Sequence, residues 1–224
     1  MDLIHFSENL RAIIPVIVLA LALTLVGTAW IDRLYLQTQD NELLSFPDQI
    51  SQRSKFRKPL LFLLLFLCIF KAWNSLSFPV SFYIIIAIVI LTYITVTDFE
   101  QYVIFDTMLI PFAIIGLCYT IHQQLSISEH LAACLCGGLL FLLLTLLTNG
   151  AIGGGDIKLI AAIGLWLGIQ SLLSVIAYGF IAGGIAALFL LITKQKCRYD
   201  YFAYGPYFAL SAIGVLLGMF KGLR

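Results

Sequence analysis

The stretch Thr148-Asn149-Gly150-Ala151-Ile152-Gly153-Gly154-Gly155-Asp156-Ile157-Lys158-Leu159 separates two long apolar segments. An acid at the start of a hydrophobic helix is costly to place in a membrane, so Asp156 is a candidate functional residue. The three glycines before it free the backbone from side-chain clashes and let another segment come close. The alternative is a plain turn in which Asp156 caps the next helix. A second acid in a matching place, Asp98, favours the functional interpretation.

The composition indicates a membrane protein. Of the 224 residues, 61% are hydrophobic and only 11% are charged, which is more apolar surface than a soluble core of this size requires. The net charge of +1 gives no indication of a nucleic-acid partner. We therefore predict an all-α polytopic protein in a lipid bilayer, with residues 1–224 forming one domain.

The apolar stretches predict about eight transmembrane helices. Several of them, the second and the sixth in particular, are shorter than the roughly 20 residues that a perpendicular span needs, so seven is the alternative count. The predicted spans are 12–30, 59–73, 80–97, 107–121, 131–147, 156–169, 172–193 and 206–220. The acids Asp2 and Glu8 are atypical of a cleaved signal peptide, so we expect the first span to be retained.

Lysine and arginine gather in cytoplasmic loops, and this bias predicts the orientation. Nine of these residues fall on one side of the eight-span topology and four on the other. The first group is Arg33, Arg53, Lys55, Arg57, Lys58, Lys158, Lys194, Lys196 and Arg198, and the second is Arg11, Lys71, Lys221 and Arg224. Both termini are then outside. The polar segment at about 32–58 becomes a cytoplasmic loop, and Asp98 and Asp156 share the cytoplasmic edge.

The other polar residues give weaker indications of a functional site. The cysteines lack the spacing of a zinc or disulfide framework, and no metal site is predicted. His122 and His130 are expected at helix ends near the interface. Glu100 and Asp106 are expected to be solvated loop acids.

Pairs of glycines four residues apart predict close helix packing in the last three spans. These pairs are Gly164 and Gly168, Gly179 and Gly183, and Gly214 and Gly218.

Two carboxyl groups within hydrogen-bonding distance can share one proton and titrate as a unit. The ionised group can activate a water molecule while its protonated partner donates a proton to the substrate. Such a pair hydrolyses a peptide bond without a metal, serine or cysteine. Asp98 and Asp156 are the candidates for this chemistry.

Several motifs together resemble those of the type IV prepilin leader peptidases, which are GxGD-type intramembrane aspartyl proteases. The most specific part is Gly153 to Leu159, followed by Gly164-Leu165-Trp166-Leu167-Gly168. Thr97-Asp98-Phe99-Glu100, with Phe105-Asp106, is similar to that family's first catalytic motif. Tyr204-Gly205-Pro206-Tyr207 looks like the entry to its final helix, and 27–34 is a weaker likeness near the start.

The resemblance implies an aspartic endopeptidase of the bacterial inner membrane. It would cut the short basic leader from prepilin or pseudopilin precursors, using Asp98 and Asp156 as the catalytic pair and no cofactor for proteolysis. Gly153, Gly155, Lys158 and Glu100 fall in the motifs and are assigned supporting roles only.

The chain departs from the family pattern in the 32–58 segment. Many relatives have a longer loop there, with two CxxC pairs that bind zinc, whereas this segment contains no cysteine. That loop has been linked to methylation of the new N-terminus with S-adenosylmethionine, so methyl transfer stays open here. Phe105 also stands where many relatives have proline.

Two other classes of function compete with the peptidase. In a small proton- or cation-coupled transporter the same acids would form a relay, which predicts acids near mid-membrane. In a non-catalytic membrane scaffold both aspartates would be helix caps. Cleavage of a precursor would separate a peptidase from both.

Overall fold

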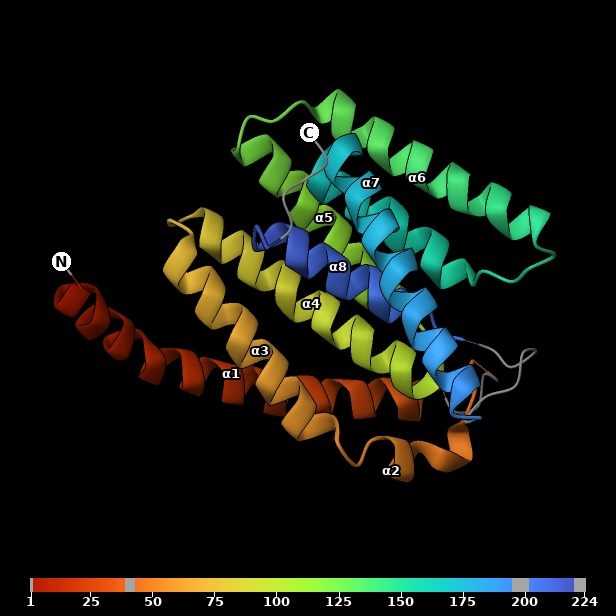
Figure 1. Ribbon diagram of the computed structural model, residues 1–224, viewed down its shortest axis with the longest axis horizontal. Coiled ribbons are helices and arrows are strands. Elements are labelled where there is room, and N and C mark those ends of the chain that lie inside the picture. The colour runs from red at the N-terminus through yellow and green to blue at the C-terminus, as the bar shows by residue number, and fades with distance from the viewer. Residues whose placement is uncertain (1, 39–42, 195–201, 220–224) are drawn as a thin grey trace. The chain divides into compact units, whose positions relative to one another are not determined.

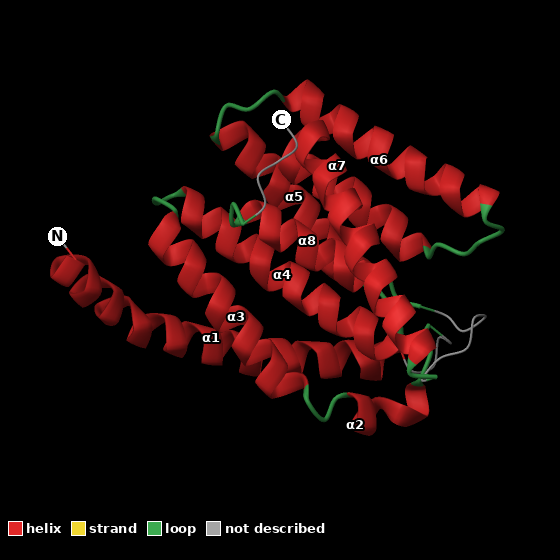
Figure 2. Ribbon diagram, in the orientation of Figure 1, coloured by secondary structure: helices red, strands yellow, loops and turns green. Residues whose placement is uncertain are grey.

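The computed structural model describes residues 2–38, 43–194 and 202–219, with the side chains of the first helix from Ile13 onward. Every regular element in these ranges is a helix (Figure 2). The helices form two compact units, residues 1–103 and residues 104–224. Cys197 and four of the bases used for the orientation lie outside the described residues. These four are Lys196, Arg198, Lys221 and Arg224.

The first unit contains three long helices, α1 (Asp2–Thr38), α3 (Arg57–Ser75) and α4 (Val80–Gln101), and α3 packs against both α1 and α4 (Figure 1). A 3₁₀ helix, η2 (Pro47–Gln49), and a short helix, α2 (Ile50–Arg53), lie between α1 and α3. Because α1 continues to Thr38, the polar segment predicted to begin at residue 32 starts inside a helix. Gly27 lets α1 approach α4, since a Cβ there would lie 2.4 Å from the ring of Tyr93.

The second unit is built around α7 (Gly154–Ile192), which packs against α5 (Asp106–His122), α6 (Ile127–Leu147) and α8 (Gly205–Leu216). A straight helix of 39 residues would be about 58 Å long, far more than a bilayer's hydrocarbon core of about 30 Å. However, α7 is broken at Gly168, whose φ of 69° and ψ of 178° are not helical. The break lies at the end of the predicted 156–169 segment.

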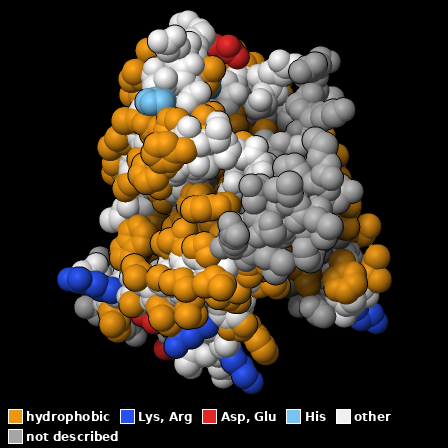
Figure 3. Space-filling view, turned by 90° about the vertical axis from the view of Figure 1, so that its left-hand side faces the viewer, with side chains coloured by type: hydrophobic (Ala, Val, Ile, Leu, Met, Phe, Trp, Pro, Cys, Tyr) orange, Lys and Arg blue, Asp and Glu red, His pale blue; other side chains and the backbone are white. Residues whose placement is uncertain are grey.

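Among the described residues, five helices are long and apolar enough to cross a membrane. Apolar side chains cover much of the surface visible in Figure 3, as expected for a protein surrounded by lipid. The apolar helices α5 and α8 have only 17 and 12 residues, and α7 combines two predicted spans. The regular structure of the described residues is thus all-helical and consistent with a polytopic membrane protein, while the number of spans and the orientation stay predictions.

The glycine pairs prove to have two different uses. Gly164 lies against backbone, since a Cβ there would be 2.7 Å from the carbonyl carbon of Ala133 on α6. Gly179 and Gly183 make room for the rings of Phe208 and Tyr204. Close packing is confirmed at these three positions. It is the wrong explanation for Gly218, which follows a helix with a positive φ and has nothing within 4 Å of a Cβ. At Gly168 the positive φ, which interrupts α7, is a second reason for glycine.

The break at Gly168 exposes backbone groups that side chains then satisfy. A non-helical residue interrupts the regular ladder of backbone hydrogen bonds around it. The carbonyl oxygen of Leu165 accepts hydrogen bonds from Thr120 Oγ1 at 3.0 Å and His130 Nδ1 at 2.8 Å. Both histidines lie at helix ends, as predicted, since His122 is the last residue of α5 and His130 lies in the first turn of α6. His130 is buried within the unit, whereas His122 is exposed.

We expect Gly168→Ala to lower the stability of the second unit. The backbone conformation at this position is essentially restricted to glycine and costs a side chain about 1–3 kcal/mol. A Cβ would also lie 3.0 Å from Glu129 Oε1. Gly184→Ala on the same helix is the matched control, because nothing lies within 4 Å of a Cβ there. Thermal unfolding in detergent measures both, and equal melting temperatures would contradict the assignment.

Candidate active site

Asp98 lies in the last turn of α4 and belongs to the first unit. Asp98 is only 5% exposed, and its backbone carbonyl oxygen accepts a hydrogen bond from the backbone N–H of Tyr102 at 3.0 Å. Tyr102 adopts a left-handed conformation with φ of 54° and ends the helix. The last turn therefore closes just after Asp98 and holds this acid at the end of an apolar helix.

Asp156 is the third residue of α7 and belongs to the second unit. Gly153 is the N-cap residue, and a Cβ on it would lie 3.6 Å from Asp156 Oδ2. An acid at this position can reach back to the N-cap backbone, so a capping role is compatible with one oxygen. The other oxygen, Oδ1, is buried and has no hydrogen-bond partner among the described residues. Capping alone leaves that oxygen unexplained.

Of the three glycines before Asp156, only Gly155 allows a close approach of another segment, and none of them has a special backbone angle. None of the three has a positive φ, whereas Gly150 does. A Cβ at Gly155 would lie 3.0 Å from the Cβ of Ile104, so a larger residue would push the chain before α5 away. Gly153 and Gly154 have no comparably close neighbour.

Lys158, one of the predicted supporting residues, pairs with Asp106. Its Nζ lies 2.8 Å from both carboxylate oxygens, and the two side chains are 59% and 57% exposed. Asp106 was expected in a loop, but it is the first residue of α5. The pair joins the start of α5 to the start of α7 inside the second unit.

We expect Lys158→Met to change the free energy of unfolding by less than about 1 kcal/mol, because exposed ion pairs contribute little. Thermal unfolding at low and high salt measures the contribution of the ion pair to stability. If Lys158 has a role beyond this pair, activity will fall while the melting temperature stays constant. A large loss of stability would show instead that the pair is structurally important.

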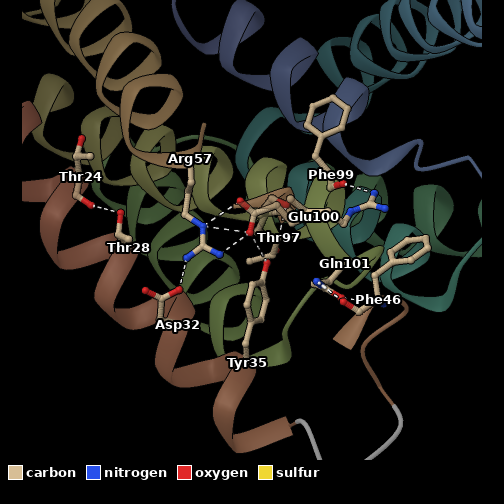
Figure 4. A network of polar contacts seen from close by, with 12 residues as sticks. Thr24, Thr28, Asp32, Tyr35, Phe46, Arg57, Thr97, Phe99, Glu100 and Gln101 are labelled. Carbon is tan, nitrogen blue, oxygen red and sulfur yellow. Dashed lines mark hydrogen bonds and ion pairs between the residues drawn. The ribbon is translucent and has the colours of Figure 1, made fainter. Parts of the chain in front are cut away.

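Glu100 is the clearest correction to the sequence analysis. It was expected to be a solvated loop acid, but it is 7% exposed and lies within α4. Arg57 binds it through three hydrogen bonds, Nε to Oε1 at 2.9 Å, Nε to Oε2 at 3.1 Å and Nη2 to Oε2 at 2.6 Å (Figure 4). Tyr35 donates its hydroxyl to Oε2 at 3.1 Å, and Arg57 Nη1 also pairs with Asp32.

This buried network was not predicted from the sequence. The orientation rule treats Arg57 as an ordinary loop base, although its side chain is 1% exposed. One signal was available: a base that precedes one apolar helix and an acid that ends the next can meet at one membrane edge, where an unpaired charge is costly. No comparable signal marked Tyr35, because tyrosines are common near helix ends in membrane proteins.

Asp98 belongs to the first unit and Asp156 to the second. The residues that the structure brings together are Glu100 with Arg57, and Lys158 with Asp106. Among the described residues, no group of three or more His, Cys, Asp or Glu side chains could hold a metal ion.

Comparison with known proteins places the predicted site inside one matched region. Residues 85–188 match the model of the type IV leader peptidase family, and this region contains all six predicted site residues. The chain is 28% identical to a prepilin leader peptidase/N-methyltransferase of Legionella pneumophila over 166 residues. That alignment covers 70% of this chain and 55% of the relative.

A second protein of that name, from Neisseria gonorrhoeae, is 31% identical over 124 residues, with 53% of this chain and 42% of the relative covered. The chain thus spans about half the length of the curated relatives it matches. No solved structure gives a significant match. Residues 85–188, which carry both candidate acids, are thus similar to the type IV leader peptidase family.

Proposed function

We propose that this protein is a membrane aspartic endopeptidase that removes the short basic leader from type IV prepilin-like precursors. The observation that carries the proposal is the family match over residues 85–188, which includes a buried acid at the end of α4 and a half-buried acid at the start of α7. The buried, unpartnered Oδ1 of Asp156 supports it, because a cap would not need that oxygen. Nothing in the comparisons supports the transporter alternative.

In the proposed mechanism Asp98 and Asp156 act on one water molecule. The ionised carboxylate takes a proton from the water, and the resulting hydroxide attacks the carbonyl carbon of the scissile peptide bond. The second, protonated carboxyl group stabilises the developing negative charge and then protonates the departing amine, so that the C–N bond breaks. The two acids end the cycle with their proton exchanged, and a further proton transfer through water restores the starting state.

We propose proteolysis without a need for S-adenosylmethionine. The relatives are named as N-methyltransferases as well as peptidases. The resemblance links methyl transfer to the loop after the first span, and the corresponding 32–58 segment has no cysteine and lies outside the matched region.

The direct test incubates the detergent-solubilised protein with a prepilin that carries its leader, with and without S-adenosylmethionine. We expect a mass shift equal to the leader in both arms and no added methyl group. The matched control is the same precursor with a bulky residue in place of the glycine that, by the family resemblance, precedes the cleavage site. An intact precursor in every arm would overturn the assignment, and a mass increase of one methyl group would overturn the restriction to proteolysis.

A further inference from the structure

The end of α4 that carries Asp98 is held by the segment between α1 and α3. Helix ends leave carbonyl oxygens without intrahelical partners. In α4, the carbonyl oxygen of Phe99 accepts Arg53 Nη2 at 3.1 Å, and that of Gln101 accepts the backbone N–H of Ser45 at 3.3 Å. The Gln101 side chain pairs with both backbone groups of Phe46, at 2.9 and 3.1 Å (Figure 4). Ser45, Phe46 and Arg53 thus cap the turn that carries Asp98.

The Arg57–Glu100 pair also restrains the rotation of that turn about the axis of α4. Successive helical residues are about 100° apart around the axis, so residues two apart point about 200° apart. Glu100 is two residues after Asp98 and is tied to Arg57 on α3 and Tyr35 on α1. Because α4 cannot turn about its axis without breaking these bonds, the direction in which Asp98 leaves the helix is fixed.

The energetics favour a geometric role over a purely stabilising one. The side chains of Arg57 and Glu100 are only 1% and 8% exposed. A buried ion pair is expensive to desolvate, and a well-packed apolar pair is often equally or more stabilising. Removing only one partner, in contrast, leaves an uncompensated buried charge. Several hydrogen bonds on a planar guanidinium, however, define an orientation that apolar contacts do not.

We infer that Arg57 and Glu100 are positioning residues for Asp98: they hold the last turn of α4 at the rotation that the proposed hydrolysis requires. This inference rests on the proposed function. Neither residue is assigned contact with the substrate, and both act through the helix that carries Asp98.

The test compares the single variants Arg57→Met and Glu100→Gln with the double variant Arg57→Met/Glu100→Leu. Cleavage of a leader-bearing prepilin gives kcat and KM, and melting temperature is measured in the same detergent. We expect both single variants to lose stability and activity. We expect the double variant to recover the melting temperature of the parent protein but to keep a kcat at least tenfold lower, with KM nearly unchanged. Lys58→Met, an exposed neighbour, is the control and should match the parent protein.

A second readout does not depend on activity. Hydrogen exchange of the amides of residues 99–102 should be faster in the double variant, because the turn loses its side-chain anchor. Parental kcat together with parental exchange in the double variant would overturn the inference. If the parent protein itself fails to cleave, the proposed function fails, and unchanged exchange in this turn would then reject the positioning role separately.

Discussion

We expect Asp98→Asn and Asp156→Asn each to abolish cleavage of a prepilin precursor, with a fall in rate of roughly 10³-fold or more, since a positioned acid or base contributes about 10²–10⁴-fold and both are needed here. Asparagine has nearly the same size as aspartate and cannot transfer the proton. Insertion into the membrane and the melting temperature should change little. Rates of leader removal by purified variants measure the effect.

The matched control is Asp48→Asn, which removes an exposed acid in η2 of the first unit. It should cleave at the parental rate, since it changes the net charge as the other two variants do. Near-parental cleavage by either Asp98→Asn or Asp156→Asn would refute the two-acid mechanism. A loss of activity in all three variants would point to a general effect of charge instead.

The second large effect is expected at Gly164, where α7 meets α6. A Cβ there would lie 2.7 Å from the Ala133 carbonyl carbon and 2.7 Å from the Cys134 nitrogen. Because these atoms belong to a helix backbone, they cannot move aside as a flexible side chain can. Overpacking of this kind costs about 1–3 kcal/mol. Gly164→Ala should therefore lower the melting temperature by roughly 3–10 °C, given about 2–4 °C per kcal/mol for a chain of this size.

Gly138→Ala tests the same helix pair without the clash. A Cβ at Gly138 would meet only the Cβ of Ala161, at an ordinary 3.4 Å. Its melting temperature should stay within a degree or two of the parent. If the Gly138 and Gly164 variants had the same melting temperature, the close backbone approach between α6 and α7 would not matter for stability.

The sequence predicted most of the helical architecture because apolar runs are long and their ends are polar. The predicted 80–97, 107–121 and 131–147 segments correspond to α4, α5 and α6, with boundaries that coincide or differ by at most four residues. The prediction was less accurate for α1, which ends eight residues after the predicted 12–30 segment. A polar residue such as Asp32 can remain in a helix when a buried partner, here Arg57, faces it. Periodicity in one segment does not reveal that partner.

The sequence predicted both acids and their pairing, and the pairing stays a prediction. Asp98 and Asp156 were marked by their positions at the ends of apolar helices, and the family match contains both. The surroundings could not be predicted, because the Glu100–Arg57 contact joins residues 43 positions apart. Glu100 therefore looked like a solvated loop acid until its packing was known. Contacts of this kind depend on how helices pack, which a single sequence leaves open.

The hydrogen bonds to the Leu165 carbonyl oxygen, beside the helix break at Gly168, have an evolutionary consequence. Thr120 and His130 come from α5 and α6, yet both donate to this one acceptor on α7. A substitution that restored a regular helix at position 168 would return that carbonyl to its own helix. Thr120 would then keep only the Gly116 carbonyl oxygen, at 3.0 Å, and His130 Nδ1 only the Thr120 hydroxyl, at 3.3 Å. Changes at these three positions should therefore be inherited together, so that the broken helix persists or disappears as a single trait.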